Sequence, residues 1–270
     1  MAEVQVSNWA EFVEAIAVSG DTVILPEEAE WNMAEILPYG LQSNVSFACR
    51  KIEGNGTRIK NLNLNSYTFM YSGMDVKYIN NLKCTDWIGT NAFFDLRYGS
   101  EWFCCVISGI TSYNCVIYNG NTYNYSSVNM CSCSINVESS NNRFNLVDKA
   151  TGNNYYCRIE LHAPNNTDIS DLGANYCIYC ELIYYAPNAT NPIAPYRFNG
   201  CTMRGNLHSV TSMSSSWQGY TNVPCIYQDD TFNDEITNPY PTKFVACSES
   251  QMHDAAYLRS FGFPIIVRSD

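Results

Sequence analysis

The carboxylates are the side chains of this sequence whose clustering could support catalysis or metal binding. The densest cluster lies within the segment 228–235 and comprises four acids, Asp229, Asp230, Asp234 and Glu235. Hard oxygen ligands of this kind bind calcium, but the spacing is not that of an EF-hand loop, and we expect a solvated turn. Glycoside hydrolysis needs two carboxylates about 5–10 Å apart. Asp95 and Glu101 flank an expected loop and are a further candidate pair, which we interpret as unrelated surface acids.

The histidines and glycines form no recognisable catalytic motif. None of His162, His208 and His253 has a nearby serine or cysteine in a nucleophile motif. The segment from Gly54 to Gly56 lacks the further glycine and the helix start of a phosphate-binding loop. We therefore favour a non-catalytic role and expect no cofactor.

The 13 cysteines could instead hold a metal or form disulfides. Cys131 with Cys133, and Cys177 with Cys180, have the spacing of zinc half-sites, but each spacing occurs once. The sequence begins MAEVQVSNWAEF, without the basic and apolar regions of a signal peptide, which predicts synthesis in a reducing cytoplasm. We expect free, buried thiols and no metal site.

The composition excludes some partners. The net charge is −11 and only six residues are lysine, so the chain lacks the basic patch that duplex DNA or an anionic membrane surface requires. No apolar run approaches the ~18 residues of a membrane span. We expect no nucleic-acid binding and no membrane insertion. Hydrophobic residues make up 46%, which supports a folded core, and asparagine and tyrosine carry much of the remaining composition.

Eight cysteines recur with a period near 23 residues. Successive members are 21 to 28 residues apart: Cys84, Cys105, Cys133, Cys157, Cys180, Cys201, Cys225 and Cys247. Periods of this size indicate a repeat architecture. The segments 156–161 and 179–184 alternate in polarity around a cysteine, as a strand with one buried face does. Similar short strands are expected at Phe103–Ile107, Val128–Val137 and Arg197–Met203. With turns rich in Asn, Gly and Ser between them, the pattern predicts a β-solenoid.

Helix signals occur only near the two ends of the sequence. Asn8 and Glu11 resemble an N-cap with its capping acid, and the residues that follow mark one apolar helical face: Trp9, Phe12, Val13 and Ile16. Ser248 and Gln251 form a second capping box, which predicts a helix through about Arg259. We expect an N-terminal cap at about 7–20 on a β-solenoid spanning 1–247, followed by a C-terminal helix and apolar tail over 248–270.

Two segments resemble the entry of right-handed parallel β-helices of the pectate-lyase-like superfamily. They are Trp9–Pro26 and Ile52–Leu62, and the second contains the pattern I-x-G-x-G-T-x-I. The resemblance covers about residues 7–247 as an architecture, and its motifs lie in the first 65 residues. The tail from Gln251 to Ile265 is similar to a closing segment of phage and prophage surface proteins of gut bacteria. Together these resemblances imply a bacteriophage virion protein of the tail, baseplate or head-decoration type, made in the host cytoplasm. By analogy with viral β-helices, they also imply a homo-oligomer such as a trimer.

The segments around Cys157 and Cys180 predict a candidate carbohydrate site. If these cysteines point inward in register, five neighbouring residues point outward: Tyr156, Arg158, Glu160, Tyr179 and Glu181. Flat rings pack on the apolar faces of sugars, and fixed ionic groups bind their hydroxyls. An ordinary cross-coil ladder, with an exposed ion pair worth under ~1 kcal/mol, explains the same pattern.

The C-terminal segment is the candidate docking element. Its apolar residues are too numerous to stay in water and would contact other chains or close the solenoid: Tyr257, Leu258, Phe261, Phe263, Pro264, Ile265 and Ile266. The sequence thus favours a non-catalytic structural or adhesion protein of a virion. It would bind a host-surface polysaccharide, other virion proteins or both, through several weak contacts at once. The alternative is a polysaccharide depolymerase, a lyase or a glycoside hydrolase, on the same scaffold.

Overall fold

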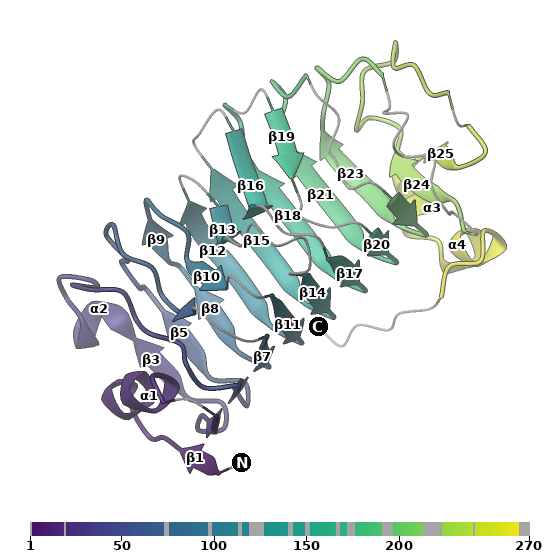
Figure 1. Cartoon of the computed structure of the whole chain (residues 1–270). Helices are drawn as coiled ribbons and strands as arrows, with labels where there is room; N and C mark the ends of the chain where they lie inside the picture. The colour runs from purple at the N-terminus through teal and green to yellow at the C-terminus, as the bar shows by residue number, and fades with distance from the viewer. Residues whose placement is uncertain are drawn as a thin grey trace.

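The chain folds as a parallel β-solenoid (Figure 1). The computed structural model describes residues 2–18, 20–72, 76–96, 99–112, 115–118, 127–139, 143–148, 152–165, 168–171, 176–190, 197–212, 223–239 and 241–264. Within these residues the chain is mostly strand, with four short helices, and neighbouring strands pair in parallel from coil to coil. The predicted all-β solenoid is confirmed, while its handedness and coil length stay predictions.

Three parallel sheets form the walls of the solenoid. Sheet A has nine strands, in the order β1 (Glu3–Gln5), β2 (Thr22–Ile24), β4 (Lys51–Glu53), β7 (Lys77–Asn80), β11 (Ser100–Phe103), β14 (Val128–Cys131), β17 (Asn153–Tyr155), β20 (Tyr176–Ile178) and β22 (Arg197–Asn199). Sheet C has five, in the order β6 (Tyr71–Ser72), β10 (Phe94–Leu96), β13 (Cys115–Tyr118), β16 (Arg143–Asp148) and β19 (Asp168–Asp171).

Sheet B is the largest of the three, with 11 strands. Its order is β3 (Glu30–Asn32), β5 (Arg58–Lys60), β8 (Lys83–Thr85), β12 (Val106–Ser112), β15 (Ser134–Ser139), β18 (Arg158–His162), β21 (Glu181–Tyr185), β23 (Thr202–Asn206), β24 (Cys225–Gln228) and β25 (Phe244–Cys247), and β9 (Ile88–Gly89) also pairs with β12. The candidate site lies on this sheet.

The N-terminal helix α1 (Trp9–Ile16) lies at the first coil, as predicted (Figure 1). The Asn8 side chain caps it by accepting from the backbone N–H of Glu11. Phe12 and Ile16 are fully buried, and Trp9 stacks on Phe69 with ring centroids 5.7 Å apart. The helix therefore covers apolar side chains that would otherwise face water at the open end. A second short helix, α2 (Met33–Ile36), follows β3 and had no counterpart in the sequence analysis.

A sharp corner joins strands of sheet A to the next strands of sheet B. One residue at each corner has a left-handed backbone. Its φ is 48° at Glu28, 78° at Gly56, 47° at Asn81, 53° at Cys104, 54° at Ser132, 55° at Tyr156, 53° at Tyr179 and 59° at Gly200. The backbone N–H of Tyr156 and that of Tyr179 each donate to a carbonyl one coil further on, at 3.0 and 2.9 Å. Glycine and asparagine tolerate this conformation, whereas it costs other L residues about 1–2 kcal/mol.

Six of the eight periodic cysteines, five of which directly follow this corner, form a buried column. They are at most 3% exposed, and the residues that follow them pair across sheet B: Cys105, Cys133, Cys157, Cys180, Cys201 and Cys225. Desolvation raises the pKa of the Cys201 thiol well above its ordinary value. The expectation of free thiols holds for the twelve cysteines whose side chains the structure describes, and ten of these are buried as expected, whereas Cys104 is exposed and Cys131 is partly buried. Cys84 and Cys247 lie outside the column. They pair in register with Ile107 and Gln228, which come two and three residues after the column members Cys105 and Cys225.

The corner also corrects the predicted strand bounds. The segments predicted as single strands at 103–107, 128–137 and 197–203 each contain the end of a sheet A strand, the corner and the start of a sheet B strand. Cys157 and Cys180 likewise precede their strands rather than lie in them. The left-handed residue that turns the chain is Cys104, Ser132, Tyr156 and Tyr179 at four of these corners. The prediction was wrong there because the period-2 polarity pattern continues through the turn.

The C-terminal helix is divided into α3 (Glu249–Met252) and α4 (Ala255–Ser260). The predicted capping box of Ser248 and Gln251 starts α3. The single helix through Arg259 was wrong, because the Asp254 carboxylate accepts from the backbone N–H of Ala256 at 2.8 Å and starts a new helix. Within the described residues, no helix is long and apolar enough to cross a membrane.

Candidate functional site

The outer surface of sheet B near β18 and β21 brings together all five residues of the predicted carbohydrate site. Arg158 pairs in register with Glu181, and Glu160 pairs with Ile183. Leu161 and Leu182 point into the core and are at most 3% exposed. The residues that alternate with them face outward, and one of these, Ile183, is covered by its neighbours and is 1% exposed.

Tyr156 and Tyr179 form a stacked pair of rings beside this surface. Their centroids are 5.7 Å apart with an interplanar angle of 18°, and Tyr156 is 39% exposed. Both sit at the left-handed corner position, where the side chain projects from the edge between sheets A and B. The predicted pairing of the two tyrosines is confirmed.

An ion-pair network runs across three coils next to the tyrosine pair. The Arg158 guanidinium contacts Glu160 at 3.3 Å and Glu181 at 3.4 Å. The Arg204 guanidinium, one coil further, contacts the other oxygen of Glu181 at 3.2 Å. These partly exposed pairs contribute under about 1 kcal/mol each to stability, so their role in folding is small. They fix the positions of two carboxylates and two guanidinium groups on an open face.

The Glu160 carboxyl is held in its ionised form. Partial burial alone would raise its pKa, but hydrogen bonds from His162 and Arg158 outweigh this, and the pKa is lowered from 4.5. The His162 Nε2 atom lies 2.8 Å from Glu160 Oε1. A glycosidase acid needs a raised pKa so that it can protonate the leaving group. Glu160 therefore acts as a hydrogen-bond acceptor in this setting.

His162 and Tyr185 form a second stacked pair at the other end of the same strands. Their rings are 4.5 Å apart at 29°, and Tyr185 is 40% exposed. The sequence analysis placed neither residue in the carbohydrate site, although the register that pairs Arg158 with Glu181 also pairs His162 with Tyr185. Aromatic groups therefore bound the charged network on two sides.

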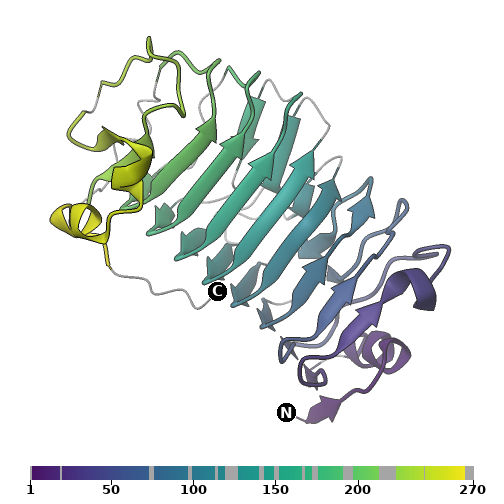
Figure 2. The same ribbon diagram turned by 180° about the vertical axis from the view of Figure 1, so that it is seen from behind.

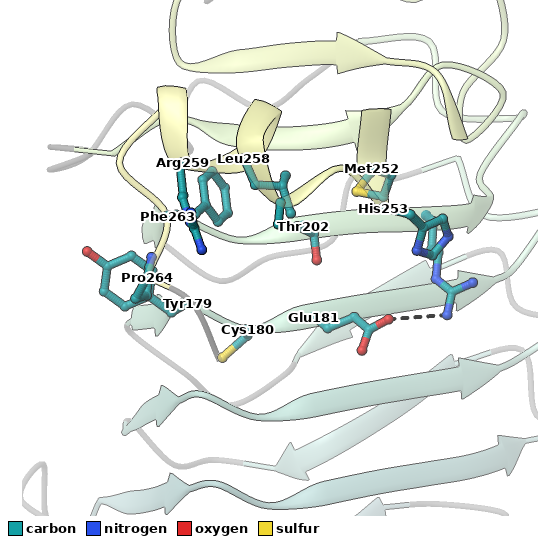
Figure 3. Close-up of a pocket in the computed structure, with 13 residues that line it drawn as sticks. Tyr179, Cys180, Glu181, Thr202, Met252, His253, Leu258, Arg259, Phe263 and Pro264 are labelled. Atoms are coloured by element: carbon teal, nitrogen blue, oxygen red, sulfur yellow. Dashed lines mark hydrogen bonds and ion pairs between the residues drawn. The ribbon is translucent and has the colours of Figure 1, made fainter. Parts of the chain in front are cut away.

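A groove of about 440 Å³ lies between this surface and the C-terminal helices (Figure 3). Its floor comes from the corner and strands β21 and β23, and its wall from α3, α4 and the residues after them. The principal lining residues are Tyr179, Glu181, Thr202, Arg204, His253, Leu258, Arg259 and Phe263. The ion pair from Glu181 to Arg204 lies at its edge.

The predicted docking residues contribute to this wall. Met252 forms a small apolar cluster with Ile226 and Cys247, and the partly buried side chains packed against it are Tyr257, Leu258, Phe261 and Phe263. Figure 2 shows the two helices in front of the last strands of sheet B. Pro264 is exposed, and Ile265 and Ile266 lie outside the described residues. Docking on another chain stays a prediction.

The other acidic candidates do not converge. Asp95 is buried in β10 of sheet C, whereas Glu101 is partly buried in β11 of sheet A. Asp229 and Asp230 are exposed in the turn after β24, and Asp234 and Glu235 are exposed in the segment that follows this turn. Among the residues that the structure describes, no group of three or more His, Cys, Asp or Glu could hold a metal ion.

A second hollow, of about 570 Å³, lies on the outer face of sheet A. The Arg50 guanidinium lies 5.7 Å from the Tyr78 ring centroid there, and Phe103, 41% exposed, lines its edge. It has fewer ionic groups than the groove on sheet B, so we place the candidate site on sheet B.

Comparisons with known proteins found no matching family model, no matching curated protein and no matching solved structure. The resemblance to pectate-lyase-like β-helices and to phage proteins therefore stays a prediction. The function has to be argued from the site, because a solenoid fold hosts many functions.

Proposed function

We propose that this chain is a non-catalytic adhesion protein that binds a carbohydrate on the outer face of sheet B. One observation carries the proposal: two stacked tyrosines project at a strained corner position directly beside a fixed network of carboxylates and guanidinium groups. The exposed part of this ring pair offers an apolar surface to a sugar, and the network offers donors and acceptors to its hydroxyls.

Stacking on consecutive coils distinguishes the two tyrosines from the other residues at the corner. The left-handed backbone alone does not, because Glu28, Cys104 and Ser132 occupy the same position with φ of 48°, 53° and 54°. Asparagine or glycine would fit this backbone at lower cost. The two large rings that stack there are the feature that favours a binding role.

The charge state of the site favours binding without cleavage. Glu160 is held ionised by His162 and Arg158, and Glu181 contacts two guanidinium groups. General acid catalysis of glycoside cleavage needs a protonated carboxyl near the scissile bond. The depolymerase alternative is therefore the second candidate and an outcome of the test below.

The setting that we propose is a virion, as the sequence resemblance implies, with several copies of the chain acting together. Individual sugar contacts are weak, and linking them on one particle raises the overall avidity by orders of magnitude. Other virion proteins would then contact surfaces away from sheet B.

The test is retention of the purified chain on a panel of immobilised bacterial surface polysaccharides, with a parallel assay for new reducing or unsaturated ends. We expect retention without new chain ends. Retention should be lost in the double variant Tyr156→Asn/Tyr179→Asn and kept in Tyr39→Asn, a control at a tyrosine that is 84% exposed. New chain ends that disappear in Glu160→Gln or Glu181→Gln would replace the adhesion proposal with the depolymerase.

A further inference from the structure

Among the residues that the structure describes, the groove beside Tyr179 is open on one side and closed on the other. No described helix covers the outer face of β15, β18 and β21, whereas α3 and α4 lie over the last strands (Figure 2). A glycan that follows the tyrosine pair from coil to coil therefore meets Leu258 and Phe263 after Tyr179 (Figure 3). Because α3 and α4 close this side, the groove can hold the end of a glycan but not the middle of a chain that continues in both directions.

The floor of the groove is shaped to receive the Tyr179 ring. A Cβ atom at Gly200 would lie 2.6 Å from two carbons of that ring, so only glycine lets the ring lie over the next corner. The groove volume of about 440 Å³ is within the usual range of small-ligand sites, about 300–1,000 Å³. This room is adequate for one sugar unit with its substituents, bounded by Tyr179 below and Phe263 on the wall.

The groove has an excess of positive charge on a chain whose net charge is −11. Its ionic lining consists of Glu181, Arg204 and Arg259. Glu181 and Arg204 contact each other at 3.2 Å. Among the described residues, the Arg259 side chain has no hydrogen-bond or ion-pair partner. A free guanidinium binds a carboxylate through two parallel hydrogen bonds.

From these features we propose that the groove binds the terminal sugar of a glycan and that this sugar bears a carboxylate. Its ring packs against the edge of Tyr179 that lines the groove and against Phe263, and its carboxylate binds Arg259. The Thr202 hydroxyl and the exposed His253 line the same space and contact its hydroxyls. This inference rests on the proposed carbohydrate binding and adds the charge and the position of the recognised unit.

The test uses two synthetic trisaccharides, each made of one glucuronic acid and two glucose units. The acid is terminal in the first and central in the second, and an all-glucose trisaccharide is the neutral probe. We expect the full chain to bind the terminal acid at least tenfold more tightly than the other two in calorimetry. In Arg259→Gln this preference falls to about one, whereas it is unchanged in Arg58→Gln, an exposed arginine that contacts Glu30 on another coil.

Each other result has a distinct meaning. Equal affinity for terminal and central acids overturns the chain-end assignment, and a preference that survives in Arg259→Gln overturns the role of that side chain. If the chain is retained by neutral polysaccharides through its tyrosine pair but does not prefer the acid, the inference fails and the proposed function stands. If no saccharide is bound by the wild-type chain, both fail.

Discussion

Replacement of the two stacked tyrosines by asparagine separates their role in binding from their role in folding. Tyr156 and Tyr179 have φ of 55° and 53°, and the same corner position is asparagine at Asn81 and glycine at Gly200. Asparagine therefore fits the backbone of the corner at lower cost than tyrosine. The double variant Tyr156→Asn/Tyr179→Asn removes both rings and keeps the fold.

The expected effect on stability is small because two terms oppose each other. The stacked pair contributes about 0.5–1.5 kcal/mol beyond its area burial. Relief of left-handed strain at two residues returns a comparable amount, since the conformation costs about 1–2 kcal/mol per ordinary residue and less for asparagine. We expect the free energy of unfolding, measured by urea titration, to change by about 1 kcal/mol or less.

The expected effect on binding is large in comparison. If a sugar covers roughly 40 Å² of each ring, burial at about 25 cal/mol per Å² contributes about 1 kcal/mol per ring. Loss of both rings then weakens binding by about 2 kcal/mol, or roughly 30-fold in Kd. The measurement is Kd for the polysaccharide that retains the wild-type chain, with Tyr39→Asn as the matched control and Tyr156→Phe as a variant that keeps the ring.

One result would refute this reasoning. A double variant that unfolds at the wild-type urea midpoint and binds with a Kd within threefold of wild type shows that the rings do not contact the ligand. A large loss of stability, above about 3 kcal/mol, would refute the assignment of a strained corner.

Three further predictions concern the scaffold. Gly200→Ala forces a Cβ to within 2.6 Å of the Tyr179 ring and should weaken glycan binding by tenfold or more, as measured by calorimetry; unchanged affinity would show that the ring position is not critical. Phe12→Ala leaves a cavity under the N-terminal cap at a fully buried site and should lower the free energy of unfolding by about 3–5 kcal/mol, whereas the exposed control Val18→Ala should leave the urea midpoint in place. Burial raises the pKa of Cys49 from 9.0 to about 12 and that of Cys247 from 9.0 to about 11. Because the unfolded thiols ionise above pH 9 and the folded ones do not, stability is full below pH 9 and declines as the pH rises toward 11–12; a melting temperature, taken with reductant present, that stays constant from pH 8 to pH 10.5 would contradict this.

Much of the scaffold could be predicted from local patterns. The cysteine period and the alternation after Cys157 and Cys180 indicated stacked short strands, and the register of β18 with β21 is the one that this alignment predicts. The N-terminal cap followed from Asn8 and the apolar face of the helix, which depend on neighbouring residues alone.

The corner could not be predicted, because its conformation is imposed by the coils above and below. A left-handed tyrosine is unfavourable in isolation, and hydrogen bonds to adjacent coils, together with the stacking of the two rings, hold Tyr156 and Tyr179 there. The period alone also grouped Cys84 and Cys247 with the column. Their spacing along the sequence is similar, but they occupy a later register position on their strands.

The groove was missed because its parts are distant in the sequence. Arg204 joins the site through the register of β21 with β23, and Arg259 reaches it because Asp254 starts a separate helix. Met252 of α3 packs on Ile226 and Cys247, and Tyr257 and Leu258 of α4 pack against the same cluster, which holds both helices over sheet B. Tertiary contacts of this kind leave no local signal in the chain.

Hydroxyl-radical footprinting of the chain with and without a retained polysaccharide tests the central claim most directly. The account predicts that oxidation of Tyr156, Tyr179 and Tyr185 slows when the ligand is bound, while oxidation of the exposed Tyr39 does not change. Protection confined to Tyr78 and Phe103, beside the hollow on sheet A, would place the ligand on sheet A and contradict the proposed site on sheet B.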